Sequence, residues 1–363
     1  MLLFLSIDNS KKDFVLYCES SFYRDHFVDL IDNLLSLDQQ NVIILTSNID
    51  DFNFFKKKTK CFFIKNYFLL QVFFKLLNCK FMIMTLTDLG QHLQKSKNCK
   101  NYVYFFHALA STHEIYTNTA FKNYDIILTN GEYQSKELIL AEEKFDFPKK
   151  EIVNSGYFFL DYIKRKAKLD IKKKQNILFA PSWNYSKKNL FEDHSINIIN
   201  KLLENNFNIT LRPHPEHFKR SKDKINKIKN TFLKNENFDL DSDISNLRSL
   251  EKAELVITDN SSIVLEFVLV FKRPIIYIDY EKKIHNPNRS QIPIETIDEK
   301  FKKEFGATVS IKDLNGMPNL CLDLIENKNQ LEEKVKIFNE KYFSNLGSSA
   351  NFAAKYLISK KDL

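Results

Sequence analysis

The sequence predicts an α/β protein in which two parallel, doubly wound sheets follow each other along the chain. Three observations support this prediction. Short apolar runs rich in Val, Ile and Phe alternate with longer segments of helical character, as expected when helices connect parallel strands. This alternation stops near residue 160 and starts again near residue 176. The chain has 363 residues, which suits two domains of ordinary size better than one.

The first half of the chain holds the strands and helices of one such sheet. The expected strands are Asp13–Cys18, Asn41–Thr46, Lys60–Ile64, Lys80–Thr85, Tyr102–Phe106, Asp125–Leu128 and Val153–Tyr157. The expected helices are Tyr23–Leu37, Phe68–Leu77, Ile115–Lys122 and Tyr133–Lys144. Asp161–Lys174 is rich in lysine and lacks a strand pattern, so we interpret it as a linker.

The second half repeats the pattern without repeating the sequence. Its expected strands are Asn176–Ala180, Asn208–Leu211, Leu255–Thr258 and Ile275–Ile278. Its expected helices are Ser195–Asn205, Lys222–Lys234, Ser245–Glu251 and Ile263–Phe271, followed by terminal helices at Leu320–Asn339 (with Pro318 just before it) and Ala350–Ser359. We therefore predict Rossmann-like domains over residues 1–165 and 166–335, and terminal helices over 336–363 that pack back on the first domain.

Composition and charge narrow the possible classes of function. Lysine and arginine total 54 against 46 acids, a net charge of +8, but the lysines are scattered in pairs and triplets. Scattered lysine usually covers a solvated surface; the alternative is a basic face for anionic lipid or a phosphorylated substrate. Nucleic acid is a weaker option, because the chain has no RNP-like motif, zinc-finger spacing or arginine-rich tract.

Cysteine usage and hydrophobic segments indicate the compartment. The five cysteines are widely spaced and form no CxxC, which predicts reduced thiols in the cytoplasm. Met1–Ile7 lacks the basic start and the cleavage site of a signal peptide. Tyr67–Leu77 is the most hydrophobic helical run, but it is far shorter than the roughly 20 residues that span a bilayer. Any membrane association should therefore be peripheral.

The segment Leu255–Asp279 reads as strand, polar turn, helix and strand. The turn residues Asp259, Asn260, Ser261 and Ser262 lie where a parallel strand ends and a helix begins. Free N–H groups and the helix dipole favour an anion at such a place, and the serine hydroxyls add donors for a phosphate. An ordinary βαβ unit with a serine N-cap is the alternative interpretation. Glu266 lies one helical turn deeper, where it could bind ribose hydroxyls or pair with a lysine.

Three more polar clusters follow predicted strands. His107 ends the strand Tyr102–Phe106; an imidazole can take a proton from a hydroxyl near neutral pH, although a lone histidine is more often structural. His113 is a second candidate, or simply starts the next helix. Ser182 and the single tryptophan, Trp183, follow Asn176–Ala180; Ser182 could reach a phosphate, and Trp183 could stack on a base or pack in the core.

The third of these clusters is the stretch Arg212-Pro213-His214-Pro215, after Asn208–Leu211. The prolines stiffen the loop around His214, and the Arg212 guanidinium suits a phosphate, unless the loop is only a rigid turn with a solvated arginine. Finally, the acidic run from Asp239 to Asp243 is a minor candidate for a magnesium site, and a helix start is the favoured interpretation.

The order of these motifs resembles the CDP-glycerol glycerophosphotransferase family, which builds teichoic-acid and related polyol-phosphate chains in bacteria. The resemblance rests on ILFAPSW, ITLRPHP, TDNSSIVLEF and KRPIIYID, over about Asn176–Tyr280, and more weakly on FHALAST and YDIILTNGEYQSKEL. It implies the GT-B fold, with two Rossmann-like domains facing a central cleft. The donor would bind mainly to the second domain, and the acceptor would approach from the first.

The resemblance also implies roles for individual residues. His107 matches a catalytic base for the acceptor hydroxyl, and His214 matches a second catalytic histidine near the donor diphosphate. Arg212, Asn260, Ser261 and Ser262 match diphosphate-binding positions, and Glu266 matches an acid of the nucleotide site. No metal or other cofactor is implied. One departure is Ala108, where the family usually has glycine, and it affects the expected acceptor geometry.

From these observations we expect a cytoplasmic transferase, peripherally associated with the inner face of the membrane. It would move a polyol-phosphate, glycerol-phosphate first, from a CDP-activated donor to a hydroxyl of a bacterial surface-glycan or lipid-linked acceptor, with release of CMP. The alternatives are a glycosyltransferase of the same fold that uses a nucleotide-sugar in capsule or lipopolysaccharide synthesis, a non-catalytic nucleotide-binding protein, and a nucleic-acid binder.

Overall fold

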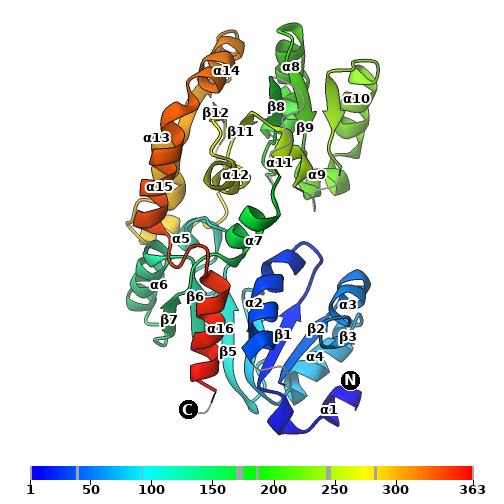
Figure 1. Cartoon of the computed structure of the whole chain (residues 1–363), viewed down its shortest axis with the longest axis vertical. Helices are drawn as coiled ribbons and strands as arrows, with labels where there is room; N and C mark the ends of the chain where they lie inside the picture. Colours follow the sequence, from blue (N-terminus) through cyan, green and yellow to red (C-terminus); the bar gives the residue numbers. More distant parts are fainter. Residues whose placement is uncertain are drawn as a thin grey trace. The chain divides into compact units, whose positions relative to one another are not determined.

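The chain divides into two compact units, which are described here one at a time. The computed structural model describes residues 2–37, 41–91, 93–168, 175–184, 188–242, 247–281 and 284–361. The first unit comprises residues 1–165, 285–294 and 340–363, and the second comprises 166–284 and 295–339 (Figure 1). The first unit is therefore built from three separate stretches of the sequence.

The first unit contains a seven-stranded sheet in which every pair of neighbouring strands is parallel. The strand order is β3-β2-β1-β4-β5-β6-β7, so the order reverses between β1 and β4. The strands are β1 (Phe14–Cys18), β2 (Val42–Thr46), β3 (Lys60–Phe63), β4 (Cys79–Met84), β5 (Cys99–Phe105), β6 (Ile126–Thr129) and β7 (Glu151–Asn154). The central strand β1 is buried along its whole length, as expected for a parallel strand covered on both faces.

Helices cover both faces of this sheet. They are α1 (Leu2–Leu5), α2 (Arg24–Leu37), α3 (Ile49–Phe55), α4 (Tyr67–Leu76), α5 (Thr112–Ile115), α6 (Glu132–Phe145), α7 (Phe158–Lys166) and α16 (Ser349–Ser359). On one face α2 and α16 lie side by side (Figure 1), and Phe27, Leu30 and Leu357 share a core with Phe14 and Leu16. On the other face, α4 contributes to a second core that contains the alternate residues of β1.

The second unit repeats this architecture with six parallel strands. Their order is β10-β9-β8-β11-β12-β13, and the reversal lies between β8 and β11. The strands are β8 (Asn176–Phe179), β9 (Asn208–Leu211), β10 (Phe238–Leu240), β11 (Leu255–Thr258), β12 (Ile275–Asp279) and β13 (Gly306–Ser310). The helices are α8 (Leu190–Glu204), α9 (Pro215–Arg220), α10 (Lys222–Phe232), α11 (Arg248–Lys252), α12 (Ile263–Phe271), α13 (Ile297–Phe305), α14 (Met317–Glu326) and α15 (Leu331–Tyr342).

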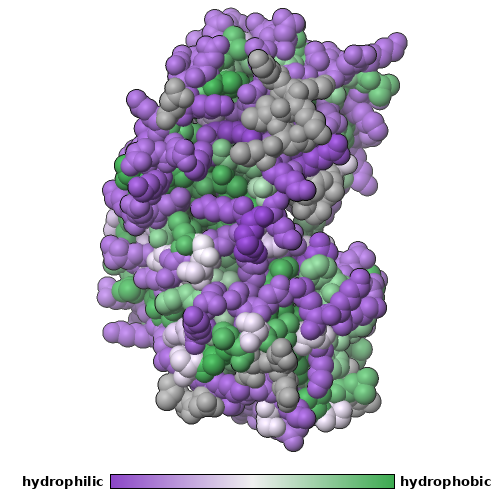
Figure 2. Space-filling view, viewed as in Figure 1, coloured by the Kyte–Doolittle hydropathy of each residue, from purple (hydrophilic) through white to green (hydrophobic). Residues whose placement is uncertain are grey.

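Most apolar side chains are buried in the cores of the two units, and the surface visible in Figure 2 is mainly hydrophilic. On the face that Figure 2 shows, hydrophilic residues dominate and hydrophobic residues form smaller groups. Within the described part of the chain, no helix combines the length and the apolar character that crossing a bilayer requires.

Two glycines make room for the segment that follows α15. A Cβ on Gly131 would lie 2.0 Å from the Tyr342 carbonyl oxygen, and one on Gly156 would lie 2.2 Å from that of Ser344. The Ser344 amide donates to the Asn130 carbonyl (3.0 Å). The buried Asp161 carboxylate then accepts hydrogen bonds from the amides of Gly347 (2.7 Å) and Ser349 (3.1 Å), just before α16. Close packing against the backbone of two glycines and hydrogen bonds to one buried carboxylate therefore fix the C-terminal segment to the first unit.

The expected helix over Ile115–Lys122 was wrong. The helix α5 ends at Ile115, and residues 117–122 form turns with bonds from Ala120 N to Thr117 O (3.1 Å) and from Lys122 N to Thr119 O (3.0 Å). The Thr117 hydroxyl donates to Asp88, and Asn118 accepts from Asn286 (3.1 Å). Short polar side chains that bond elsewhere compete with helix formation, which explains the difference.

Several other element bounds also differ from expectation. The terminal helix expected over Leu320–Asn339 is split into α14 and α15 by a 3₁₀ turn at Lys328–Gln330, and Pro318 lies inside the first turn of α14, where it costs no hydrogen bond. The expected linker begins as α7, and its residues 169–174 lie outside the described residues. The helix expected from Ser245 begins at Arg248, with residues 243–246 outside the described residues. The sequence patterns missed α1, α3, α9, α13, β10 and β13.

Gly131→Ala tests the fixation of the C-terminal segment. We expect a loss of about 1–3 kcal/mol in the free energy of unfolding, because the new methyl group would overlap a backbone carbonyl that cannot rotate away. Gly316→Ala is the matched control, since nothing lies within 4 Å of its Cβ, and should leave the unfolding midpoint unchanged or slightly higher. Equal midpoints for the two variants in urea would contradict this account.

Candidate active site

In the first unit, His107 lies at the carboxyl edge of the sheet, two residues after β5. Its ring contacts other aromatic rings: the centroid of Tyr23 lies 4.6 Å away, that of His26 6.3 Å and that of Tyr116 6.4 Å. The His107 carbonyl accepts a hydrogen bond from the Tyr157 hydroxyl (3.1 Å). Backbone and ring of His107 are therefore both held by aromatic side chains.

The surroundings of His107 keep its imidazole neutral. Its Nδ1 atom is buried and has no hydrogen-bond partner among the described residues. Burial lowers the pKa of His107 to about 4, because a charged imidazole would lose its hydration there. The neighbouring His26 is buried, and burial followed by the charge of His107 holds its pKa well below the ordinary value. A neutral imidazole at neutral pH is the form that can accept a proton.

Side chains of the β6–α6 segment fix the loop that follows His107. The carbonyl of Ala108 accepts from Asn130 Nδ2 (2.8 Å), that of Leu109 from the Tyr133 hydroxyl (2.5 Å) and that of Ala110 from Gln134 Nε2 (3.2 Å). Three successive carbonyls are thus bound by one short stretch of chain. These hydrogen bonds hold the loop that carries His107 in place, in a chain that has Ala108 directly after this histidine.

His113, the second histidine of this region, has a structural environment. Its ring Nδ1 lies 3.6 Å from the buried Glu137 carboxylate, which also accepts from the amide (2.6 Å) and hydroxyl (2.8 Å) of Thr112. Burial disfavours the charged form of His113, but the Glu137 carboxylate outweighs it and the net pKa is raised. His113 therefore closes the start of α5 onto α6.

In the second unit, Ser182 and Asp259 join the ends of β8 and β11. The amide and hydroxyl of Ser182 donate to the two carboxylate oxygens of Asp259, at 2.7 and 2.8 Å, and both residues are buried. The Thr258 hydroxyl donates to the Ala180 carbonyl (2.7 Å) one step below. Strand order reverses between these two strands, which is where open α/β sheets bind their ligands. The Ser182 hydroxyl expected to meet a phosphate is directed to Asp259 instead.

The polar turn and the helix α12 have the arrangement that the sequence predicts. Asn260 is exposed, Ser261 and Ser262 are partly exposed, and the helix begins at Ile263. The Ser261 amide donates to the Thr258 hydroxyl (3.3 Å), and Ser262 makes no side-chain capping hydrogen bond. Glu266 lies one turn further along α12 and is partly exposed. This turn and the start of the helix can present N–H and hydroxyl donors to an anion.

His214 is the exposed N-cap of the short helix α9, and Pro215 is the first helical residue. The Glu216 amide donates to its Nδ1 (3.2 Å), so the proton of a neutral ring lies on Nε2. The Trp183 ring stacks on the His214 ring, with 6.2 Å between the ring centroids. The Arg220 guanidinium lies over the same tryptophan, 5.6 Å from the centroid of its ring. His214 and the loop of Ser182 therefore meet at the same edge of the sheet.

Arg212 is anchored inside the second unit. Its guanidinium Nη1 donates to the Ser249 hydroxyl (2.7 Å) and lies 3.5 Å from the Asp241 carboxylate, and the residue is buried. This position ties β9 to α11 and to the end of β10. These contacts support the loop before His214, and the expected role of Arg212 in binding the donor diphosphate stays a prediction.

The acidic run does not form the short loop that was considered for magnesium. Asp239 belongs to the strand β10, Asp241 faces Arg212, and Asp243 lies outside the described residues. The interpretation of this run as a helix start falls partly on residues 243–246, which lie outside the described residues, and stays a prediction.

Sequence reasoning missed several residues that shape the two sites. His26 lies on a helix with a strong hydrophobic periodicity, which hides a histidine on its buried face. His217 is fully buried, stacks on Phe191 at 4.1 Å and contacts the Ser182 carbonyl through Nε2 (3.3 Å). Asp259 was noticed only as a turn residue. For Asp259 a usable signal existed, because an acid directly after a buried parallel strand lies at the ligand-binding edge.

The lowered pKa of His107 has a consequence for stability in acid. Below about pH 6.5 the unfolded chain binds a proton on this histidine, whereas the folded protein does not until about pH 4. Stability is therefore lost as the pH falls through this window, by up to roughly 3 kcal/mol for a shift of this size. We expect the midpoint of thermal unfolding, measured by circular dichroism, to fall less steeply between pH 6.5 and pH 4 in His107→Gln than in the wild type.

His194→Gln, on α8, is the matched control and should follow the wild-type curve. His26 is buried and also has a lowered pKa, so part of the pH dependence of the unfolding midpoint should persist in His107→Gln. An unchanged slope in His107→Gln would show that the imidazole is not buried as described.

Comparison with known structures identifies the fold. The wall teichoic acid polymerase TagF aligns with a TM-score of 0.66 and 15% sequence identity, over 99% of this chain and 92% of that chain. The S. aureus MnaA–UDP structure aligns with a TM-score of 0.65 and 11% identity, over 97% of both chains. The UDP-GlcNAc 2-epimerase from Neisseria meningitidis aligns with a TM-score of 0.56 and 10% identity, over 96% of this chain and 100% of that chain. The fold is thus of the GT-B type, as predicted.

The sequence was also compared with curated proteins and with models of protein families. No curated protein matches it. The family model described as CDP-glycerol:poly(glycerophosphate) glycerophosphotransferase matches residues 62–351, a stretch that includes His107, Ser182, His214 and the start of α12. The chain is therefore a transferase and belongs to the CDP-glycerol:poly(glycerophosphate) glycerophosphotransferase family.

Proposed function

We propose that this enzyme transfers glycerol phosphate from CDP-glycerol to a hydroxyl group of a bacterial surface-glycan or lipid-linked acceptor and releases CMP. The observation that carries the proposal is the family match over residues 62–351, which covers the candidate residues of both units. A structure of TagF, which shares the fold, was obtained with CDPG. The acceptor class follows from the resemblance described above.

His107 would act on the acceptor. His107 is partly exposed, and its neutral imidazole can take the proton of the attacking hydroxyl, while the hydroxyl oxygen forms a bond to the β-phosphorus of the donor. The bond between that phosphorus and the oxygen of the leaving CMP then breaks. The aromatic contacts and the fixed loop keep the imidazole in position, so little reorganisation is needed before the reaction.

The donor would bind to the second unit. The turn Asn260–Ser262 and the start of α12 offer N–H and hydroxyl donors to its diphosphate, and the Nε2–H of His214 can donate to a diphosphate oxygen. Glu266 is proposed to contact the ribose. Arg212 and Ser182 support this edge through Ser249 and Asp259, and Trp183 stacks on His214. We propose that these groups suffice without a metal ion.

Release of CMP from CDP-glycerol by the purified full-length protein tests the proposal, with EDTA present and water or a glycerol-containing acceptor as nucleophile. We expect turnover that falls by about 10²–10⁴ in His107→Ala, because general-base catalysis is lost. His214→Ala should lower the rate and weaken donor binding. His194→Ala changes a histidine of the second unit whose ring meets that of Tyr280 edge to face, and this variant should behave as the wild type.

The same assay with UDP-, GDP- and CMP-sugars discriminates the main alternative. Two structures of this fold contain UDP or a UDP-sugar, namely the MnaA and N. meningitidis proteins. Turnover of a nucleotide-sugar with no reaction of CDP-glycerol would replace the phosphotransferase by a glycosyltransferase. Binding of nucleotides without turnover, unaffected by His107→Ala, would indicate a binding protein.

We also propose that the enzyme works at the inner face of the membrane and contacts anionic lipid through α4. Tyr67, Phe68, Leu69 and Leu76 of this helix are exposed apolar residues, with Phe68 69% exposed. Lysines stand close to them in the sequence, at positions 56–58, 60, 65 and 75. An exposed apolar helix face flanked by lysines is complementary to an anionic bilayer surface.

Sedimentation with vesicles tests this contact. We expect the protein to bind vesicles of anionic phospholipid but not of phosphatidylcholine, and the double substitution Phe68→Ser, Leu69→Ser to reduce binding at least tenfold. Leu233→Ser removes an equally exposed leucine from the second unit and serves as the control. Unchanged binding of the double variant would exclude α4 as the lipid contact.

A further inference from the structure

A carboxyl group without an assigned role lies at the carboxyl edge of the sheet in the first unit. Glu19 directly follows β1, and Thr85 directly follows β4, so the two residues lie where the strand order of this sheet reverses. The Thr85 hydroxyl donates to Glu19 Oε1 (3.2 Å) and Oε2 (3.3 Å). Within the described residues, no lysine, arginine or histidine forms an ion pair with Glu19. The Glu19 backbone amide also donates to this carboxylate. A partly buried carboxylate with these two donors still has unused capacity to accept hydrogen bonds.

Tyrosine side chains surround this carboxyl group. Burial raises the pKa values of Tyr17, Tyr23, Tyr104 and Tyr124, and the charge of Glu19 is a further cause for all four. The Tyr23 ring also packs against that of His107, at an interplanar angle of 54°. Glu19 and the proposed base are thus connected through one aromatic ring.

A cavity of about 540 Å³ opens near the ends of β1 and β4. Its walls include Tyr17 at the end of β1 and Leu86, which follows Thr85, together with Ser47, Lys65 and Leu70. The Tyr17 hydroxyl lies 3.0 Å from that of Ser47. A volume of this size accommodates a small organic group, and its lining combines apolar walls with hydroxyl and ammonium donors.

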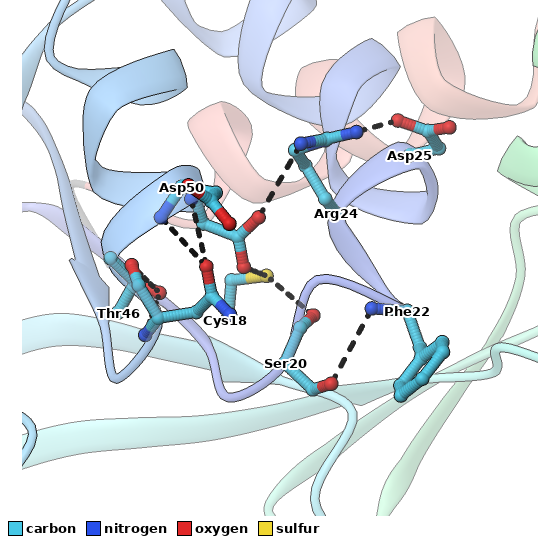
Figure 3. A network of polar contacts seen from close by, with 9 residues as sticks. Cys18, Ser20, Phe22, Arg24, Asp25, Thr46 and Asp50 are labelled. Atoms are coloured by element: carbon cyan, nitrogen blue, oxygen red, sulfur yellow. Dashed lines mark hydrogen bonds and ion pairs between the residues drawn. The ribbon is translucent and has the colours of Figure 1, made fainter. Parts of the chain in front are cut away.

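The segment that carries Glu19 and Tyr23 is held by a polar network (Figure 3). The Cys18 thiol donates to the Ser20 carbonyl (3.4 Å) and to the Asp51 carboxylate (3.8 Å), and Arg24 lies 3.7 Å from the same carboxylate. The Phe22 amide donates to the Ser20 hydroxyl (3.4 Å). Both ends of the loop between β1 and α2 are thus tied to Asp51 of α3, which gives Glu19 a defined position.

We propose that Glu19 is a positioning residue of the acceptor site. Its carboxylate accepts a hydrogen bond from a hydroxyl group of a polyol or sugar acceptor, and the remainder of that acceptor occupies the cavity bounded by Tyr17, Ser47 and Lys65. Glu19 itself forms no bond and exchanges no proton in the reaction. The proposal rests on the proposed function, because it takes the acceptor to be a hydroxyl compound bound by the first unit.

Glu19 would make acceptor binding depend on pH. Burial raises its pKa to about 7, with the Thr85 hydrogen bond acting in the opposite direction. The charge of Glu19 contributes to the raised pKa values of Cys18 and the four tyrosines, so these groups keep their protons near pH 7. Near pH 7, Glu19 is therefore the member of this group that changes its charge.

Calorimetric titration of the full-length protein with 1-O-octylglycerol, a neutral diol on an apolar tail, tests the proposal without the donor. Between pH 6 and pH 8 the ionised fraction of Glu19 rises from about one tenth to about nine tenths. We expect the wild-type Kd to fall by about tenfold across this range. Glu19→Gln should bind as weakly at both pH values as the wild type does at pH 6, and Thr85→Val should shift the pH at which binding changes.

Glu143→Gln, an exposed acid of α6, is the control and should retain the wild-type behaviour. An equal pH dependence in Glu19→Gln, or a wild type that does not bind the diol at either pH, would overturn the proposal. CMP release from CDP-glycerol is measured separately. If the wild type releases no CMP but binds the diol in the expected pH-dependent way, the proposed function is refuted, and what stands is a hydroxyl-binding site at Glu19 without its assignment to the acceptor.

Thermal unfolding distinguishes a positioning role from a purely structural one. The folded protein holds a proton on Glu19 up to a higher pH than the unfolded chain, so stability is lost as the pH rises from about 4.5 to about 7. Glu19→Gln removes this loss, and we expect its Tm at pH 8 to exceed that of the wild type. A lower Tm at both pH 5 and pH 8 would make Glu19 structural and overturn the proposal.

Discussion

The parallel arrangement of the strands is the constraint on which both candidate sites depend. When all strands run in one direction, every strand ends at the same edge of the sheet, and polar residues far apart in the sequence become neighbours there. Glu19, Thr85 and His107 follow β1, β4 and β5 in the first unit. Ser182, His214 and Asp259 follow β8, β9 and β11 in the second. The polar residues at this edge can therefore be substituted in either unit without a change in the apolar strands that precede them.

Burial is the second determinant, because it fixes the charge state of the groups at the edge. His107 and His26 are held neutral, whereas Glu19 retains its proton up to a higher pH than an exposed glutamate. The structure accepts an energetic cost for each of these groups, since a better-hydrated position would stabilise the protein. Such costs are characteristic of residues that serve a reaction rather than the fold.

Periodicity predicted the strands and the fold class well, because buried parallel strands form continuous apolar runs such as Leu255–Thr258. It could place His107, His214 and the Asn260–Ser262 turn at strand ends for the same reason. It could not show what each side chain contacts. Arg212 is anchored by Ser249 and Asp241, and Ser182 by Asp259, through pairings that depend on tertiary structure. His26 and His217 were missed because a buried histidine on an amphipathic helix looks like any other core residue.

The composition of the first unit from three stretches of the chain affects how the protein can fold during synthesis. On the ribosome, the first 165 residues emerge while the helix that lies beside α2 is still untranslated. Ala353, Ala354 and Leu357 of that helix complete the core around Phe27 and Leu30, so this apolar surface stays uncovered until the whole second unit has been made. The second unit, in contrast, has all its strands available by residue 310. Vectorial synthesis therefore favours early completion of the second sheet and leaves this apolar surface of the first unit open to chaperones until α16 has been translated.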